Sequence, residues 1–357
     1  MTPMNRPAED AHVYLCSADD KRSAFAAAVE QSHFIEHISR KCAESGKARE
    51  EFRVAIKPNF MTACVPQDDS PIYTDPELVD ALVDVMRDAG FRTFVVVESQ
   101  NVFNYSYAGR TVAAVAEMCG YSGKNYRIVD LSDDAEKVPL DYGGVLGKHV
   151  AGRSWLEADY RISFAKNKTN WQCYYTACLK NVVGCLPEWD KMKWYHGPGI
   201  EIQQAVMLLI EQMPIDFCFI DAWVSSDGIT GHVHARRDLP TRTIFASQSL
   251  VAIDWVSGEK MGLDPSHNSF VREATSRWPV GTIHRHGDMT PWPDWRNIRP
   301  IVVGTLDHGE EHYGLSRFVA SLLAGEMDSR FPAMGGMGWF YRLEYRIIKL
   351  LERLLST

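Results

Sequence analysis

The sequence lacks the signals of several large classes of protein. It has no run of about 18 apolar residues, the length that a membrane-spanning helix needs. Its N-terminus contains no apolar core of the signal-peptide type. The net charge of -8 is opposite in sign to that of most nucleic-acid-binding proteins. We therefore expect a cytoplasmic protein that binds no nucleic acid.

The sequence motifs of several enzyme classes are also missing. No G-x-G-x-x-G follows a predicted strand, and no G-x-S-x-G occurs. The segment from Gly143 to His149 is one residue short of a Walker A loop and lacks its Ser or Thr. These absences disfavour hydrolysis of nucleotide triphosphates and dinucleotide binding of the Rossmann type.

The first half of the chain alternates predicted strands and helices. Phe52–Ile56 alternates with the period of a strand, and Thr93–Val97 is a β-branched and aromatic run typical of a buried parallel strand. Between them, Asp75-Pro76-Glu77 has the cap, the proline and the acidic residue that begin a helix. This order predicts an α/β fold with a mostly parallel, doubly wound sheet and flanking helices.

The second half repeats this order less regularly. We expect residues 1–150 and 151–325 to form two halves of one α/β domain, followed by a tail of residues 326–357. The expected strands of the second half are Tyr160–Phe164, Phe217–Val224, Thr243–Ala246 and Ile301–Val303, and the expected helices are Ile200–Met213 and Ser249–Met261.

The tail contains a predicted amphipathic helix. From Met337 to Leu355, Phe, Leu and Ile side chains fall on one helical face and four basic side chains on another. A basic amphipathic helix can lie on an anionic membrane surface. A helix that packs on its own domain or on a second subunit has the same apolar stripe. Peripheral membrane contact and homo-oligomer contact through residues 337–357 therefore both remain open.

Polar residues follow two of the predicted strands. Lys57 and Asn59 come directly after Phe52–Ile56, and Glu98 follows Thr93–Val97. Open α/β sheets bind ligands at the carboxyl ends of their strands. Lys57 and Asn59 could bind an anion there, and Glu98 could act as a base, a ligand or a partner for Lys57. A solvated strand end is the alternative.

The richest polar stretch runs from Ser163 to Pro187. It contains Lys166, Lys168 and Thr169, and then Lys180 and Asn181 on an expected short helix from Thr176 to Val183. On such a helix Thr176 and Lys180 would share one face. We expect the lysines to hold an anionic ligand, Asn59 and Asn181 to orient it, and Lys180 to act as a catalytic group.

A candidate proton-transfer residue precedes the second expected helix of this half. His196 stands before a Gly-Pro-Gly turn, and free amides at a helix start can receive an anion. His196 could serve as acid, base or ligand. Glu201, in the first turn, could instead satisfy the helix end, which would leave His196 as a surface or capping residue.

Several groups have residue types that bind metals. Cys173, Cys178 and Cys185 have a C-x4-C-x6-C spacing that matches neither ferredoxin clusters nor zinc knuckles. Other candidates are two His-x-His pairs, the first of which would need Asp221 or Asp227 as a further ligand, and an H-x-x-E-H motif whose histidines would share a helical face. These pairs are His232 with His234, His284 with His286, and His33 with His37.

The motifs together resemble the family catalogued as domain of unknown function 362. The matching pieces occur in the order of the family and span roughly residues 50–265. They are Val54–Phe60, Thr74–Val79, Val97–Ser99, Ser163–Thr169, Leu179–Gly184, Tyr195-His196, Val251–Asp254 and Met261–Pro265.

This resemblance implies an α/β fold and little about activity. Some relatives carry an added iron–sulfur module, which this chain lacks. Relatives tend to have an acidic Gly-Pro-rich loop where this chain has His232, His234, Arg236 and Arg237. Asn170 stands where relatives often have His. These differences leave a shared substrate open.

We therefore expect an enzyme that acts on a small anionic metabolite, a carboxylate or a phosphate. Lys180, His196 and Glu98 are its expected catalytic residues. One alternative is a redox protein that binds a divalent metal or an iron–sulfur cluster through the cysteines or through His232 and His234. The other is a non-catalytic or membrane-recruited binding protein.

Overall fold

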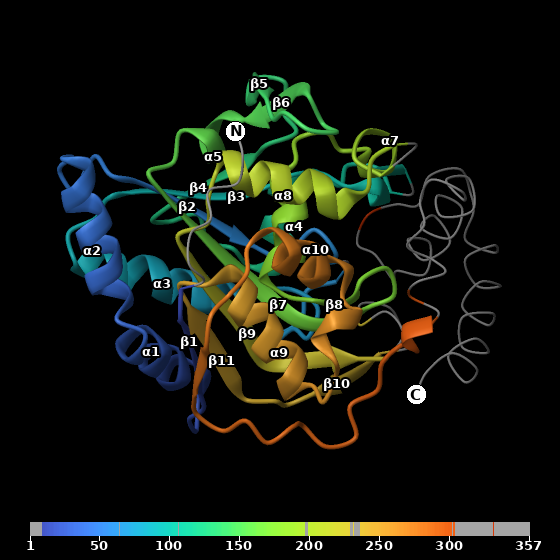
Figure 1. Ribbon diagram of the computed structural model, residues 1–357. Coiled ribbons are helices and arrows are strands. Elements are labelled where there is room, and N and C mark those ends of the chain that lie inside the picture. The colour runs from blue at the N-terminus through green and yellow to red at the C-terminus, as the bar shows by residue number, and fades with distance from the viewer. Residues whose placement is uncertain are drawn as a thin grey trace.

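Figure 1 shows the computed structural model of the protein. It describes residues 9–303 except 64, 106, 197–198, 229–230, 232–235 and 302, together with residue 331. The expected helix at residues 337–357 and the pair His232 and His234 lie outside the described residues.

One mixed sheet forms the centre of the described structure. Its strands are β1 Ala11–Cys16, β2 Arg53–Pro58, β3 Thr93–Glu98, β4 Arg127–Asp130, β7 Tyr160–Asn170, β8 Tyr174–Thr176, β9 Phe217–Asp227, β10 Arg237–Leu239, β11 Thr243–Ser247 and β12 Ile283–His286. The main order is β12-β1-β11-β9-β7-β2-β3-β4, with β8 on β7 and β10 on β9. Strands from both halves of the chain therefore share one sheet.

The predicted fold class is confirmed by the strand directions. β4, β3, β2, β7 and β9 pair in parallel, which places their carboxyl ends at one edge. β11 runs antiparallel to β9, and β1 runs antiparallel to β11. The sheet is thus parallel on one side of β9 and mixed on the other.

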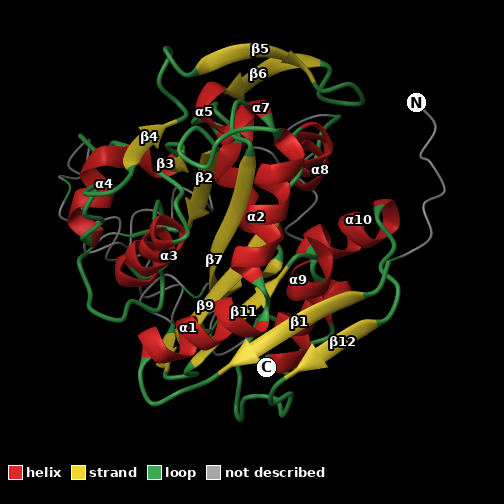
Figure 2. Ribbon diagram, turned by 90° about the vertical axis from the view of Figure 1, so that its left-hand side faces the viewer, coloured by secondary structure: helices red, strands yellow, loops and turns green. Residues whose placement is uncertain are grey.

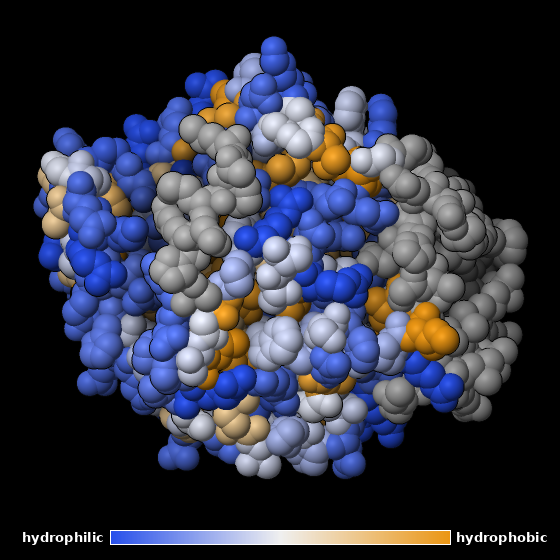
Figure 3. Space-filling model, in the orientation of Figure 1, coloured by the Kyte–Doolittle hydropathy of each residue, from blue (hydrophilic) through white to orange (hydrophobic). Residues whose placement is uncertain are grey.

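Helices cover both faces of the sheet (Figure 2). The apolar side chains of the first four helices pack with β2 on one face, and those of α8, α9 and α10 pack on the other. These helices are α1 Lys21–Gln31, α2 Phe34–Ser45, α3 Pro76–Asp88, α4 Val112–Cys119, α8 Ile202–Gln212, α9 Leu250–Lys260 and α10 Ser269–Arg277. The outer side of the α8–α10 layer is mostly hydrophilic (Figure 3), as expected for solvent-facing helices.

Short elements connect these layers. A two-stranded sheet and a one-turn helix precede β7, and two one-turn helices and a 3-10 turn follow β8. They are β5 Lys137–Asp141, β6 Lys148–Gly152, α5 Arg153–Leu156, α6 Cys178–Asn181, η2 Val182–Cys185 and α7 Lys191–Trp194. No helix in the described part of the chain is both long and apolar enough to cross a membrane.

The expected strand at residues 301–303 is wrong. Pro300, Ile301 and Val303 are helical. Pro is tolerated in the first turn of a helix, where its missing N–H has no intrahelical partner. A short apolar run does not by itself distinguish a strand from the start of a helix.

Candidate functional site

The carboxyl ends of β2 and β3 lie side by side, and the residues that follow them interact directly. Lys57 Nζ donates to Glu98 Oε2 at 2.9 Å and to Asn181 Oδ1 at 3.1 Å. Both side chains of the ion pair are at most 4% exposed. The Ser99 N–H also donates to Glu98 Oε1 at 3.1 Å. Of the three roles considered for Glu98, which are base, ligand and partner for Lys57, its position matches the third.

A glycine allows this pair to lie against the following turn. An ideal Cβ on Gly184, in η2, would lie 1.9 Å from Glu98 Oε1 and 2.3 Å from Lys57 Cε. Real Cβ contacts are not this short, so any larger residue at position 184 would displace the Lys57–Glu98 pair. The Lys-Asn-Val-Val-Gly sequence thus brings α6 and η2 onto the strand ends.

Asn181 connects three segments of the site. Its Nδ2 donates to Lys57 O at 2.6 Å and to Ser163 Oγ at 3.1 Å, while its Oδ1 accepts from Lys57 Nζ. Asn59 Nδ2 lies 3.4 Å from the same Oδ1. The side chain is buried. Asn181 therefore uses its donors and its acceptor within the protein, which fixes β2 relative to β7.

Lys168 reaches the same group of asparagines from β7. Its Nζ donates to Asn59 Oδ1 and to Thr62 Oγ1, each at 2.8 Å, and also to Ile72 O. The side chain is 2% exposed. Lys57, Asn59, Lys168 and Asn181 thus form one hydrogen-bonded network within the protein.

Lys166 has a different environment. Its Nζ lies 2.9 Å from Asp221 Oδ2, and both side chains are at most 1% exposed. The Asp221 carboxylate also accepts the N–H of Asp75, at the start of α3, and the N–H of Trp223. This buried pair ties β7, β9 and α3 together, which is a structural arrangement.

Thr169 contributes an oxygen that has no partner among the described residues. Asn167 Oδ1 and Thr176 Oγ1 are likewise buried without one. Gly231 lies against this segment, because a Cβ there would be 2.6 Å from Thr169 O. The β7–β8 end of the sheet therefore holds buried polar atoms that its described neighbours leave unsatisfied.

The expected helix from Thr176 to Val183 is shorter than predicted. Thr176 belongs to β8, where it pairs with Lys168, and α6 begins only at Cys178. Thr176 and Lys180 therefore do not share a helical face. The chain reverses between β7 and β8 with Tyr174 at φ 82°, a conformation that bulky residues rarely adopt.

Lys180 lies on α6, which a buried carboxylate holds in place. Asp254 accepts the N–H of Cys178 at 2.8 Å and that of Leu179 at 2.9 Å, and burial raises the pKa of Asp254 to about 7. The Lys180 side chain is partly buried and makes no hydrogen bond or ion pair with any described residue. Its ammonium group is thus positioned on a fixed helix without a counter-charge from that part of the chain.

Lys191 is a second lysine without a carboxylate in an ion pair among the described residues, and sequence reasoning missed it. Lys191 begins α7, is 6% exposed, and donates to Ser99 Oγ at 2.8 Å, to Glu188 O at 2.7 Å and to Leu186 O. No described carboxylate forms an ion pair with it, and burial lowers its pKa to about 7. No sequence signal marks Lys191, because lysines at helix starts are normally exposed.

His196 is buried at the end of the α7 segment. Its Nδ1 lies 3.4 Å from Glu201 Oε2, and neither atom has a hydrogen bond of good geometry with a described residue. Glu201 precedes α8, and its N–H is bonded by Gln204 Oε1 at 3.3 Å. Glu201 and Gln204 thus cap the start of α8, as the alternative expects, but His196 is buried rather than at the surface, and its imidazole faces the Glu201 carboxylate.

The three candidate cysteines are separately buried. Cys173 Sγ contacts Asn170 Oδ1 at 3.4 Å, and Cys178 Sγ contacts Phe219 O at 3.3 Å. Burial raises the pKa of the Cys178 and Cys185 thiols, which disfavours the thiolate that metal ligation needs. Across the described residues, no three or more His, Cys, Asp or Glu side chains are grouped so that they could hold a metal ion.

The H-x-x-E-H histidines do not share a helical face. His33 precedes α2 with φ 51°, and its side chain is 72% exposed. His37 is buried, with its Nδ1 2.6 Å from Tyr160 OH. The left-handed conformation of His33 places it before the first turn of α2, so only His37 lies on the helix that the motif requires.

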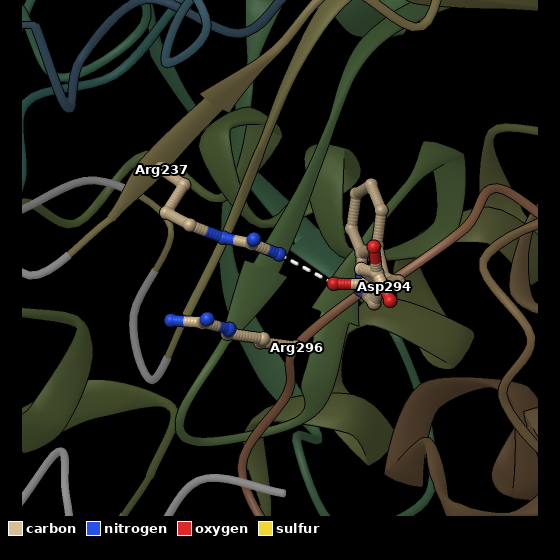
Figure 4. Close-up of a pocket in the computed structure, with 4 residues that line it drawn as sticks. Arg237, Asp294 and Arg296 are labelled. Carbon is tan, nitrogen blue, oxygen red and sulfur yellow. Dashed lines mark hydrogen bonds between the residues drawn. The ribbon is translucent and has the colours of Figure 1, made fainter.

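Asp227 is hydrogen-bonded to two arginines that line a pocket. Arg237 pairs with its carboxylate, which also accepts the Arg296 N–H at 2.8 Å. Arg237, Asp294, Trp295 and Arg296 line a cavity of about 470 Å³. Figure 4 shows the Arg237 guanidinium directed at the Asp294 carbonyl. Asp227 thus fixes Arg237 relative to the segment that contains Arg296.

Sequence comparison identifies relatives of this chain. The profile of the family described as Domain of unknown function (DUF362) matches residues 54–259, which is more than half of the chain. A thylakoid-associated protein of Synechocystis sp. is 25% identical over 221 residues, 60% of this chain and 64% of that protein. The chain thus spans less than two thirds of the length of this curated relative.

Two solved structures share a distant likeness. The lactate racemase apoprotein from Thermoanaerobacterium thermosaccharolyticum is 12% identical with a TM-score of 0.37, over 65% of this chain and 54% of that one. A Thermotoga maritima protein is 12% identical with a TM-score of 0.34, over 59% of this chain and 52% of that one. Likeness at this level carries no conclusion about activity.

Proposed function

The chain belongs to the family described as domain of unknown function 362, and we propose that it is an enzyme that binds a small anionic metabolite, a carboxylate or a phosphate, at its strand ends. The matched region contains the lysines, asparagines and histidine on which this proposal rests. The ligand would lie beside α6 and α7, at Lys180, which forms no ion pair with any described residue.

The balance of charge is the observation that carries the proposal. Lys57 and Lys166 are each neutralised by a buried carboxylate. Lys180 and Lys191 form no ion pair with any described residue. Lys191 uses its three N–H donors within the protein, whereas the Lys180 ammonium group has no partner among the described residues. Removing an ammonium group from water without a counter-charge is unfavourable, so a site at Lys180 favours an anion.

The surrounding groups supply orientation and proton transfer. Lys57, Asn59, Lys168 and Asn181 form a bonded wall that holds α6 in position. Lys180 would bind the anionic group through a charge-assisted hydrogen bond. His196, which faces Glu201, is the candidate acid or base. Glu98 would act by fixing Lys57, because its carboxylate is occupied by that lysine.

The test compares two lysine variants by calorimetric titration with inorganic phosphate and with short mono- and dicarboxylates. We expect Lys180→Met to weaken the binding of the preferred anion about 10–100-fold, the loss of one charged hydrogen bond. Lys124→Met is the matched control, because Lys124 is exposed. Unchanged binding in Lys180→Met would show that the anion does not bind at this lysine.

A second proposal concerns location. We propose that residues 337–357, which lie outside the described residues, contact an anionic membrane surface peripherally. The sequence of this segment is basic and amphipathic, and the relative in Synechocystis sp. is named as thylakoid-associated. Co-sedimentation with phosphatidylserine vesicles should be strong for the full chain and weak for a chain that ends at residue 336. Equal sedimentation would exclude this role for the segment.

A further inference from the structure

A row of aromatic rings lies where the first and last strands of the sheet meet. β12 pairs in parallel with β1, and the register places His284 opposite His12 and His286 opposite Tyr14 (Figure 2). Alternate residues of a strand point to the same side. All four rings therefore share one face at the edge of the sheet. In the order of strands, β11, β9 and β7 separate β1 from β2 and β3, whose ends carry the Lys57–Glu98 pair.

Two of these imidazoles are in direct contact. His12 Nδ1 lies 2.9 Å from His286 Nε2, although the residues are 274 positions apart in the chain. The His12 ring also stacks on His284 with 4.7 Å between centroids, and Tyr14 stacks on His286 at 4.5 Å. The contact between His12 and His286 is exposed. The site is thus both organised by the strands and open to solvent.

The neighbouring charged groups are bonded to other residues and do not block the His12–His286 contact from a ligand. Asp10 Oδ2 lies 3.3 Å from His284 Nε2, which directs that imidazole to Asp10. Arg285 forms two bonds of 2.8 Å to the Glu259 carboxylate, so its charge is balanced there.

The distance suits a metal that prefers imidazole. Zn²⁺, Cu²⁺ and Ni²⁺ bind imidazole nitrogen at about 2.0–2.1 Å, so two adjacent nitrogen ligands lie roughly 3 Å apart. In the N–H···N contact one ring supplies a hydrogen. On metal binding that hydrogen moves to the other nitrogen of the same neutral ring, and both facing nitrogens then present lone pairs. Both rings remain neutral. Their two nitrogens face each other along the hydrogen bond, so both exposed rings must rotate to direct their lone pairs at the metal.

We propose that His12 and His286 form a two-histidine site for a divalent transition metal, Zn²⁺, Cu²⁺ or Ni²⁺, whose remaining positions are filled by water. Within the described part of the sheet, β12 is a four-residue edge strand that pairs only with β1. A metal bound by both histidines would cross-link this edge strand to β1. The site is independent of the proposed anion-binding site.

The experiment measures the binding of Ni²⁺, Zn²⁺ and Cu²⁺ to the metal-free full chain by calorimetry, and the melting temperature with and without each ion. Replacing one of two linked ligands removes the advantage of simultaneous contact, so we expect His12→Gln or His286→Gln to weaken binding on the order of 100-fold. The metal should raise the melting temperature of the wild type and not that of these variants.

Two further variants keep the result specific. His284→Gln removes a ring turned to Asp10, and His267→Gln removes an exposed histidine outside the row. Both should bind metal within about threefold of the wild type. The proposal is overturned if His12→Gln and His286→Gln bind as tightly as the wild type, or if either further variant weakens binding equally. Circular dichroism of each metal-free variant should match that of the wild type, because the replaced rings are solvent-accessible.

Discussion

Lys166 on β7 and the lysines Lys180 and Lys191 on α6 and α7 differ in how their charge is balanced. Lys166, on β7, is paired with Asp221 in the core, and both partners complete a network that ties β7, β9 and α3 together. Lys180 and Lys191, on α6 and α7, have no such carboxylate among the described residues. Similar residue types in one short stretch of sequence thus divide into lysines bonded within the protein, such as Lys166 and Lys191, and Lys180, whose ammonium group is left for a ligand.

The largest expected effect on stability tests the structural group. Lys166→Met would leave the Asp221 carboxylate buried without its cation, which should lower the free energy of unfolding by about 3–5 kcal/mol. Lys180→Met removes a side chain without a described partner, so its effect should stay within about 0.5 kcal/mol. Urea denaturation of both variants measures the difference. Equal losses would contradict the division into two groups.

A smaller loss of stability is expected at Gly184, where η2 lies against the Lys57–Glu98 pair. The added methyl group in Gly184→Ala would overlap Glu98 and Lys57, and overpacking of this kind costs about 1–3 kcal/mol. Because the overlap displaces the strand ends beneath α6, anion binding should weaken as well. Urea denaturation and calorimetric titration of this variant measure the two effects. A variant as stable as the wild type would show that η2 does not press on the Lys57–Glu98 pair.

The third effect is a dependence on pH. Burial holds the folded-state pKa of Lys191 at about 7, below the ordinary 10.5 of the unfolded chain. Between these values the unfolded state binds more protons, so the stability contributed by Lys191 rises as the pH rises from about 7 to 10.5. The melting temperature of the wild type minus that of Lys191→Met should therefore increase from pH 7 to pH 9.5. A constant difference would place Lys191 in a water-exposed environment.

The sequence predicted the fold and the strand ends for a physical reason. Runs such as Thr93–Val97 have the pattern of buried parallel strands, and the rule that strand ends share an edge then brings Lys57 to Glu98. The predicted resemblance to the family is likewise confirmed. These inferences depend only on local pattern and on a general property of parallel sheets.

The sequence could not predict features that depend on tertiary contacts. Tyr174 and His33 adopt left-handed conformations without the Gly or Asn that usually signals a turn, so the β7–β8 hairpin and the break before α2 were missed. Lys191 is buried only because α7 packs against the end of β3. The contact between His12 and His286 requires the register of two strands from opposite ends of the described chain.

The most direct test of the central claim is to locate a bound anion. Crystals of the full chain soaked in selenate would reveal the anion by its anomalous scattering. We predict a peak whose selenate oxygens lie at hydrogen-bond distance, roughly 2.7–3.2 Å, from the Nζ of Lys180. A peak only in the pocket between Arg237 and Arg296, with none beside Lys180, would contradict the account.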